Sequence, residues 1–107
     1  MRKIVVVAVM SIGLVIGLTT IAQASQTVKA TASLSFSPAT AHVSKNETVV
    51  WKNTAGFQHS VTATGGGWSK NSVIAPGGHT SFTFHSNGTY RYKCRFHAGM
   101  TGKIIVG

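Results

Sequence analysis

Residues 80–94 read TSFTFHSNGTYRYKC, two runs of alternating side chains joined by a Ser-Asn-Gly turn. Aromatic residues recur at every second position in parts of both runs. Alternation with a period of two is typical of half-buried β-strands, and an Asn-Gly pair between two such runs favours a tight turn. We therefore expect strands over residues 80–85 and 89–94 that form a hairpin or a corner.

Similar short runs, rich in Val, Thr, Phe and Tyr, extend from residue 27 to the end of the chain, with Gly, Pro, Asn and Ser between them. Helical periodicity is poor throughout this region. Short strands at close spacing with frequent turn signals are typical of an antiparallel sandwich or small barrel. The other expected strands cover residues 27–36, 39–44, 48–53, 59–63 and 103–106, and residues 65–78 are expected to be irregular.

Alternation in the run 89–94 divides its side chains between two faces. The aromatic face ends in a cysteine and is expected to point into the core. The opposite face is cationic and is expected to face solvent. The inward set is Tyr90, Tyr92 and Cys94, and the outward set is Arg91, Lys93 and Arg95.

Residues 1–24 have the pattern of a secretory signal peptide. A short basic start, MRK, precedes the almost wholly apolar residues 4–18, and residues 22–24, Ala-Gln-Ala, have the small-x-small form of a cleavage site. An uncleaved membrane anchor is the alternative, but the apolar run is short for a span of ~20 residues. We expect one mature domain over residues 25–107, without a membrane span, in the periplasm or outside the cell.

The charge balance and the cysteine count exclude several classes of protein. The 107 residues include ten Lys+Arg, one acidic residue, Glu47, and one cysteine, Cys94. One cysteine excludes a disulfide framework within the chain, and it excludes zinc sites built on four cysteines or on two cysteines and two histidines. One carboxylate excludes the paired carboxylates of glycoside hydrolysis. A mature domain this small buries little apolar surface, so a bound metal is a reasonable source of extra stability.

A thiol, an imidazole and a thioether lie close together near the end of the chain. In YKCRFHAGMTGKIIV, residues 92–106, they belong to Cys94, His97 and Met100. Thiolate and thioether are soft ligands and imidazole is borderline, a combination that suits copper. Two histidines and one cysteine in a plane, with a weak axial methionine, form blue-copper electron-transfer sites. The motif therefore predicts a copper site that needs one more histidine.

The second histidine is best supplied by His59, which starts an expected strand after a short loop and would approach the C-terminal loop from a neighbouring position in the sheet. His42, His79 and His85 are expected to be surface or turn residues. The alternative to a metal site is that Cys94 is a buried apolar residue or pairs with a second chain. In that case the nearby histidine and methionine would be ordinary turn and core residues.

From residue 28 onward the chain resembles the cupredoxins, the small blue-copper proteins. The specific match is GTYRYKCRFHAGMTGKIIV, residues 88–106. The spacing Cys-x-x-His-x-x-Met is similar to amicyanin, whereas plastocyanin and pseudoazurin have two more residues between the histidine and the methionine. Supporting matches are FSP (36–38), TVVWKN (48–53), HSVT (59–62), PGG (76–78) and FTF (82–84).

The resemblance implies an all-β fold, an antiparallel Greek-key β-sandwich of about seven to eight strands. It also implies one type 1 copper ion, bound by His59, Cys94, His97 and Met100. In many cupredoxins an asparagine beside the first histidine ties the two ligand loops together by hydrogen bonds. Here Gln58 and Ser60 hold those positions, so a serine hydroxyl is left to replace part of that bonding.

The implied function is to carry single electrons between a donor and an acceptor protein, without enzymatic activity. The exposed edge of His97 would be the electron port, inside an apolar contact patch formed by Phe96, Ala98, Gly99 and Phe57. After signal removal, eight basic residues and one acidic residue give a net charge of +7, which favours a partner with an acidic docking surface. We expect a monomer, and no nucleic-acid ligand because no binding motif is present.

Three other functions are open. A copper carrier or chaperone needs exchangeable, often methionine-rich binding, but Met100 is the only methionine after residue 24. A copper oxidase or nitrite reductase needs further copper ions and open coordination positions, and the other histidines are scattered. A metal-free sandwich that binds acidic polymers through its positive charge would remain colourless with copper.

Overall fold

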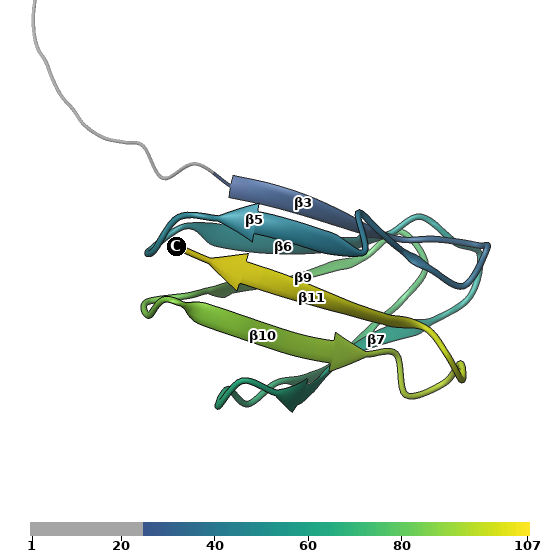
Figure 1. The fold of residues 1–107 in the computed structure, drawn as a ribbon. Coiled ribbons are helices and arrows are strands. Elements are labelled where there is room, and N and C mark those ends of the chain that lie inside the picture. The colour runs from purple at the N-terminus through teal and green to yellow at the C-terminus, as the bar shows by residue number, and fades with distance from the viewer. Residues whose placement is uncertain (1–24) are drawn as a thin grey trace, which may run out of the picture.

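The computed structural model describes residues 25–107, so the expected signal peptide at residues 1–24 lies outside the described part of the chain. Residues 25–107 form nine β-strands and no helix, and accordingly no helix there is long and apolar enough to cross a membrane. Figure 1 shows their course. The strands are β3 (Ser25–Ala30), β4 (Phe36–Ser37), β5 (Thr40–Val43), β6 (Thr48–Asn53), β7 (His59–Gly65), β8 (Asn71–Ile74), β9 (His79–Thr83), β10 (Gly88–Lys93) and β11 (Thr101–Val106).

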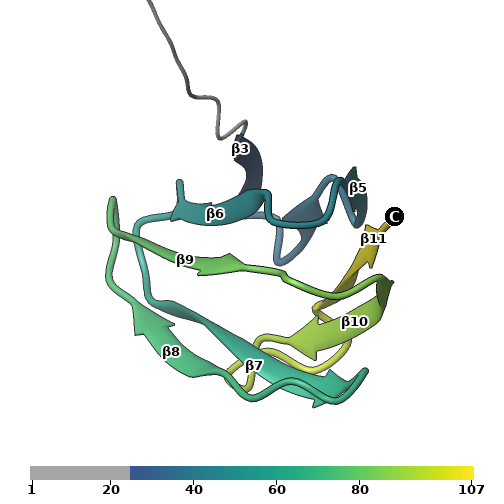
Figure 2. The ribbon, with the colours of Figure 1, turned by 90° about the vertical axis from the view of Figure 1, so that its left-hand side faces the viewer.

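The strands form two sheets that pack face to face (Figure 2). One sheet has the order β5-β11-β10-β7-β8, and the other has the order β4-β3-β6-β9. The all-β sandwich expected from the sequence is confirmed, with nine strands. β9 and β10 lie in different sheets, so the Ser-Asn-Gly turn between them forms a corner and not a hairpin.

Both sheets are mixed, which the expectation of antiparallel strands did not include. β3 pairs with β6 and β11 pairs with β5 in parallel, while the other five pairings are antiparallel. Parallel neighbours need a crossover connection. In both cases the chain passes through the opposite sheet between the two partners, and it therefore returns in the same direction.

A turn at residues 31–35 interrupts the single strand expected over 27–36. The Thr31 N–H donates to the Ser35 carbonyl (3.0 Å), the Leu34 N–H donates to the Thr31 carbonyl (3.1 Å), and Leu34 has a φ of 60°. The hydroxyls of Thr31, Ser33 and Ser35 also bond to one another. Such side chains offer the backbone local hydrogen bonds in place of pairing with a neighbouring strand. The alternating sequence pattern continues through the turn, and the pattern alone therefore predicts one strand where the structure has two.

β8 lies inside residues 65–78, which the sequence predicts to be irregular. It is an edge strand that pairs with β7 from Thr62↔Asn71 to His59↔Ile74. Ile74 is the only buried residue of its four, so the hydrophobic pattern that identifies a strand is almost absent. The pairing fixes the position of His59, the first residue of β7.

Aromatic rings fill the space between the two sheets. Trp68, from the loop between β7 and β8, stacks on Trp51 with ring centroids 6.2 Å apart and donates its indole N–H to the Arg91 carbonyl (3.1 Å). The ring of Tyr92 meets Trp51 edge-on at 5.4 Å. The inward face of β10 is as predicted, since Tyr90, Tyr92 and Cys94 are buried and Arg91, Lys93 and Arg95 are exposed.

Candidate metal centre

Three loops meet at one end of the sandwich, where Figure 1 shows the turns after β3, β6 and β10 close together. They comprise residues 31–35, 54–58 and 94–100. His59 is the first residue of β7, Cys94 directly follows β10, and Met100 directly precedes β11. The hydrogen-bonded strands therefore fix the positions of three of the four predicted copper ligands.

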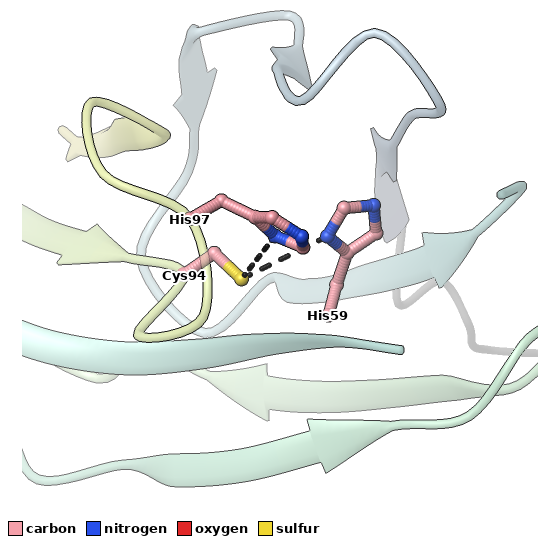
Figure 3. Close-up of side chains that lie close together, drawn as sticks. All are labelled: His59, Cys94 and His97. Carbon is pink, nitrogen blue, oxygen red and sulfur yellow. Dashed lines mark hydrogen bonds between the residues drawn. The ribbon is translucent and has the colours of Figure 1, made fainter. Parts of the chain in front are cut away.

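His59, Cys94 and His97 lie together at this end (Figure 3). The Cys94 Sγ atom is 3.4 Å from Nδ1 of His97 and 3.7 Å from Nδ1 of His59. One donor atom from each of the three residues lies within 4.8 Å of the others. Sulfur and nitrogen donors that share a zinc ion at about 2.0–2.3 Å are about 3.3–3.8 Å apart, so the spacing fits one first-row metal ion.

Met100 is buried at the end of the same loop, with 1% of its surface exposed. Its N–H donates to the His97 carbonyl at 3.2 Å, and its carbonyl accepts the Cys94 N–H at 2.9 Å. The His97 N–H in turn approaches the Cys94 carbonyl at 3.5 Å. These backbone bonds close a short loop that holds a thiol, an imidazole and a thioether in one place.

The side chain of His59 is oriented by a backbone carbonyl. Its Nε2 atom lies 2.9 Å from the carbonyl oxygen of Thr31. Because a carbonyl can only accept, Nε2 carries the proton and the neutral ring presents its lone pair at Nδ1, the atom that faces Cys94. A hydrogen bond of this kind fixes both the tautomer and the ring orientation of a metal-binding histidine.

The surroundings of His59 favour its neutral, metal-binding form. Burial lowers the pKa of His59 below its ordinary value of 6.5; the hydrogen bond to Thr31 raises this pKa, and the positive charge of His97 lowers it. A histidine must be deprotonated to bind a metal ion. The net lowering of the pKa therefore reduces the competition between protons and a metal ion for Nδ1.

Ser60 links β7 to the cysteine. Its backbone N–H donates to Cys94 Sγ at 3.3 Å, and its hydroxyl accepts the Arg95 N–H at 2.9 Å. Ser60 is fully buried, whereas Gln58, on the other side of His59, is exposed. The serine hydroxyl thus forms the bond between the two ligand loops that the sequence suggested for it. An N–H group aimed at sulfur stabilises a thiolate.

Comparison with known proteins identifies the family. Residues 22–107 match the family described as copper binding proteins, plastocyanin/azurin family. The chain belongs to this family of cupredoxins. It is 40% identical over 88 residues to the chloroplastic plastocyanin of Fritillaria agrestis, a match that covers 69% of this chain and 53% of that protein. It is 38% identical over 87 residues to a plastocyanin of Lactuca sativa, a match that covers 68% and 88% of the two chains.

A solved structure of an amicyanin mutant in its Cu(I) form is also similar to this cupredoxin. The two share 28% sequence identity with a TM-score of 0.72, over 81% of this chain and 86% of that one. The chain spans about half the length of several chloroplastic plastocyanins that it matches. Membership of a copper-binding family, together with the thiol and imidazole donors, supports one copper ion as the cofactor.

Asn53 is a residue of the cupredoxin site that the sequence analysis missed. It is fully buried at the end of β6, and its side-chain amide donates to the Phe57 carbonyl (2.8 Å) and the Ile74 carbonyl (2.9 Å). Its Oδ1 atom accepts the Ala55 N–H at 2.8 Å. One side chain therefore shapes the loop that leads into His59. An asparagine at the end of the expected strand TVVWKN was the available signal.

The remaining histidines do not join the metal cluster in the part of the chain that the structure describes. His42 and His79 are exposed on β5 and β9. His85 is also exposed, and its Nδ1 atom lies 2.8 Å from Oδ1 of Asn46. These positions agree with the expectation that all three are surface or turn residues of this cupredoxin.

Proposed function

We propose that this cupredoxin is a blue-copper electron carrier in which His59, Cys94, His97 and Met100 bind one type 1 copper ion. The proposal is carried by the convergence of two imidazole Nδ1 atoms on one buried cysteine sulfur, at 3.4 and 3.7 Å. A thiolate, two imidazoles and a weak thioether suit copper in both oxidation states. The bound ion would supply a one-electron couple between Cu(I) and Cu(II).

Each side chain has a separate role in this proposal. Cys94 is the thiolate ligand, and the Ser60 N–H supports its negative charge. His59 and His97 would bind the copper ion through Nδ1, and Met100 would supply a weak thioether ligand. Because backbone hydrogen bonds hold the ligand loop and His59, these groups move little when the charge of the site changes. Small movement lowers the energetic cost of each electron transfer.

Electrons would enter and leave through His97, which is partly exposed at the end of the sandwich. The ring of Phe57 stands edge-on to His97 with centroids 5.6 Å apart. Phe57 and Phe96 are 41% and 39% exposed, and Ala98 and Gly99 are exposed beside them. We call Phe57, Phe96, Ala98 and Gly99 the apolar patch. A partner can approach His97 over this patch with little removal of water from charged groups.

The alternative function is a copper carrier that delivers its ion to another protein. The burial of His59, Cys94 and Met100, which are at most 2% exposed, favours slow release of the ion and hence electron transfer. We do not propose an enzyme, since enzymes of related chemistry need a coordination position open to substrate, and four protein ligands leave none here.

We also propose where the protein works and what it meets. Residues 1–24 would be removed as a signal peptide, which leaves the blue-copper domain, residues 25–107, as a monomer in the periplasm or outside the cell. Its redox donor and acceptor would have acidic docking surfaces because the mature chain has a net charge of +7. Nucleic acid is not an expected partner.

The decisive experiment adds Cu(II) to the purified apo-protein and records visible absorption, electron paramagnetic resonance and voltammetry. We expect an intense blue colour, a type 1 signal and one reversible one-electron wave. Cys94→Ser should abolish all three, whereas His42→Gln, at an exposed histidine outside the cluster, should keep them. A wild-type protein that stays colourless would overturn the proposal. Rapid loss of copper to a chelating acceptor protein would favour the copper carrier instead.

A further inference from the structure

The outer face of the five-stranded sheet combines positive charge with an open hollow. Arg91 of β10 and Lys103 of β11 lie directly opposite each other in the strand register. Together with Thr40, Thr64 and Thr101 they line a hollow of about 390 Å³. The centre of this face therefore offers two cations and three hydroxyl groups to a ligand.

The positive charge continues along β10 and into the ligand loop. Arg91 and Lys93 are exposed at alternate positions of β10, which lie about 6.6–6.8 Å apart in a strand. Arg95 is also exposed and lies just beyond the end of this strand, in the ligand loop. The Arg95 guanidinium donates to Oδ1 of Asn71 at 2.7 Å and lies 5.1 Å from the ring centroid of Phe96, so it is held beside the apolar patch. We call Arg91, Lys93, Arg95 and Lys103 the basic face.

No acidic side chain is available to neutralise the basic face. Glu47 is the only acidic residue in the sequence. It lies in the turn between β5 and β6, where its carboxylate accepts the Ser44 N–H at 2.7 Å. Like charges directly opposite each other on neighbouring strands destabilise a sheet. The pair of Arg91 and Lys103 therefore carries a cost that a bound anionic group would relieve.

We propose that the basic face docks an extended acidic segment of the redox partner, an inference that rests on the electron-carrier function proposed above. Carboxylates at alternate positions of an extended segment repeat at the same spacing of about 6.6–6.8 Å. Two of them pair with Arg91 and Lys93 at this spacing, and the end of the segment reaches Arg95, while the threonine hydroxyls of the hollow donate hydrogen bonds to the segment. Since Lys93 and Arg95 flank Cys94, the docked segment holds the partner close to the ligand loop.

The four-stranded sheet provides a matched control for this surface. Lys29 of β3 and Lys52 of β6 are also opposite each other in register, and both are exposed. Replacing this pair by glutamine removes the same two charges as replacing Arg91 and Lys103. Any effect of net charge alone must therefore be equal in the two double variants.

The test measures binding of a synthetic peptide of alternating Glu and Thr to the copper-loaded protein by calorimetry at low salt. We expect the Arg91→Gln/Lys103→Gln variant to bind about tenfold more weakly or worse, since two close charges are lost. The Lys29→Gln/Lys52→Gln variant should bind within about twofold of wild type. Absence of peptide binding to wild type, or equal losses in both variants, would overturn the inference.

Other polyanions are tested in the same way. Tighter binding of duplex DNA or of phosphatidylserine vesicles than of the peptide would also overturn the inference, because the basic face would then serve a different class of partner. The visible spectrum of each sample separates this result from the proposed function. A colourless wild type contradicts the electron carrier, whereas a blue protein that ignores the peptide contradicts only the docking surface.

Discussion

The backbone N–H of Ser60 lies 3.3 Å from the sulfur of Cys94, and this contact joins two segments that are 34 residues apart in the chain. The Ser60 hydroxyl accepts the N–H of Arg95 as well, at 2.9 Å. A single buried residue of β7 therefore holds the cysteine sulfur and the next residue of the ligand loop. The double contact therefore fixes Cys94, which directly follows β10, relative to His59, the first residue of β7.

Ser60→Ala keeps the N–H that faces Cys94 but removes the acceptor of the Arg95 N–H. Loss of a hydrogen bond costs about 0.5–1.5 kcal/mol, and this bond is part-buried, so we expect the free energy of unfolding of the apo-protein to fall by about 1 kcal/mol in denaturant titrations. Copper should still bind, with a shifted reduction potential. Ser60→Asn, which restores an acceptor, should recover part of the stability. Wild-type stability in Ser60→Ala would show that the bond is unimportant.

The parts of the site that the sequence predicted most directly are encoded locally, whereas His59 was predicted because a blue-copper site needs a second histidine and because the chain resembles the cupredoxins. Cys94, His97 and Met100 fall within one short loop, and the alternation of the preceding strand is visible in consecutive residues. Thr31 could not be predicted, because it acts on His59 through a backbone carbonyl that every residue has. Asn53 acts through carbonyls of distant residues, and their proximity exists only in the folded chain.

The same distinction applies to the fold. Alternating side chains predicted the strands around Trp51 and Tyr92 because the buried residues of each strand occupy alternate positions. β8 escaped prediction since only Ile74 of its four residues is buried. The parallel pairings could not be read from local patterns either, because the direction of a neighbouring strand depends on how the chain crosses between the two sheets.

Asn53→Ala should be more damaging than a loss of hydrogen bonds at the surface. It leaves two carbonyls and the Ala55 N–H without their partner, and each unsatisfied buried group costs about 1–3 kcal/mol. We expect unfolding to become easier by at least about 2 kcal/mol, measured on the apo-protein in denaturant. Asn71→Ala is the matched control, because its side-chain bonds to Thr62 and Arg95 are exposed. Similar losses in both variants would contradict this account of Asn53.

Gly102→Ala tests the packing beneath the ligand loop. A Cβ atom at Gly102 would lie 2.5 Å from the hydroxyl oxygen of Tyr92, which stands opposite it on β10. Overpacking of this kind costs about 1–3 kcal/mol, and thermal unfolding should detect the loss. Gly56→Ala is the control, since no atom lies within 4 Å of its Cβ position. A stable Gly102→Ala would mean that Tyr92 can move away freely.

The stability of the apo-protein should depend on pH through His59. Burial is the main cause that lowers the pKa of His59 from 6.5 in the folded protein. The unfolded chain therefore binds the proton more readily, and stability is fully present above pH 6.5 and is lost as pH falls through the lower folded pKa. Melting temperatures on both sides of pH 6.5 measure this loss. His59→Gln should reduce the pH dependence and His42→Gln should retain it; the opposite pattern would assign the effect elsewhere.

Ala98→Asp should slow electron exchange between oxidised and reduced copies of the protein while leaving the blue spectrum intact. A carboxylate in the apolar patch must lose its water when two copies meet at His97.

Val73→Asp supplies the matched control, because Val73 is an exposed apolar residue, 47% accessible, on β8. Both variants reduce the net positive charge equally, so mutual repulsion falls by the same amount in each. NMR line broadening in mixtures of the two oxidation states gives the exchange rate. We expect Ala98→Asp to be at least about tenfold slower than Val73→Asp, the effect of about 1.4 kcal/mol on the barrier. Equal rates would place the electron port away from His97.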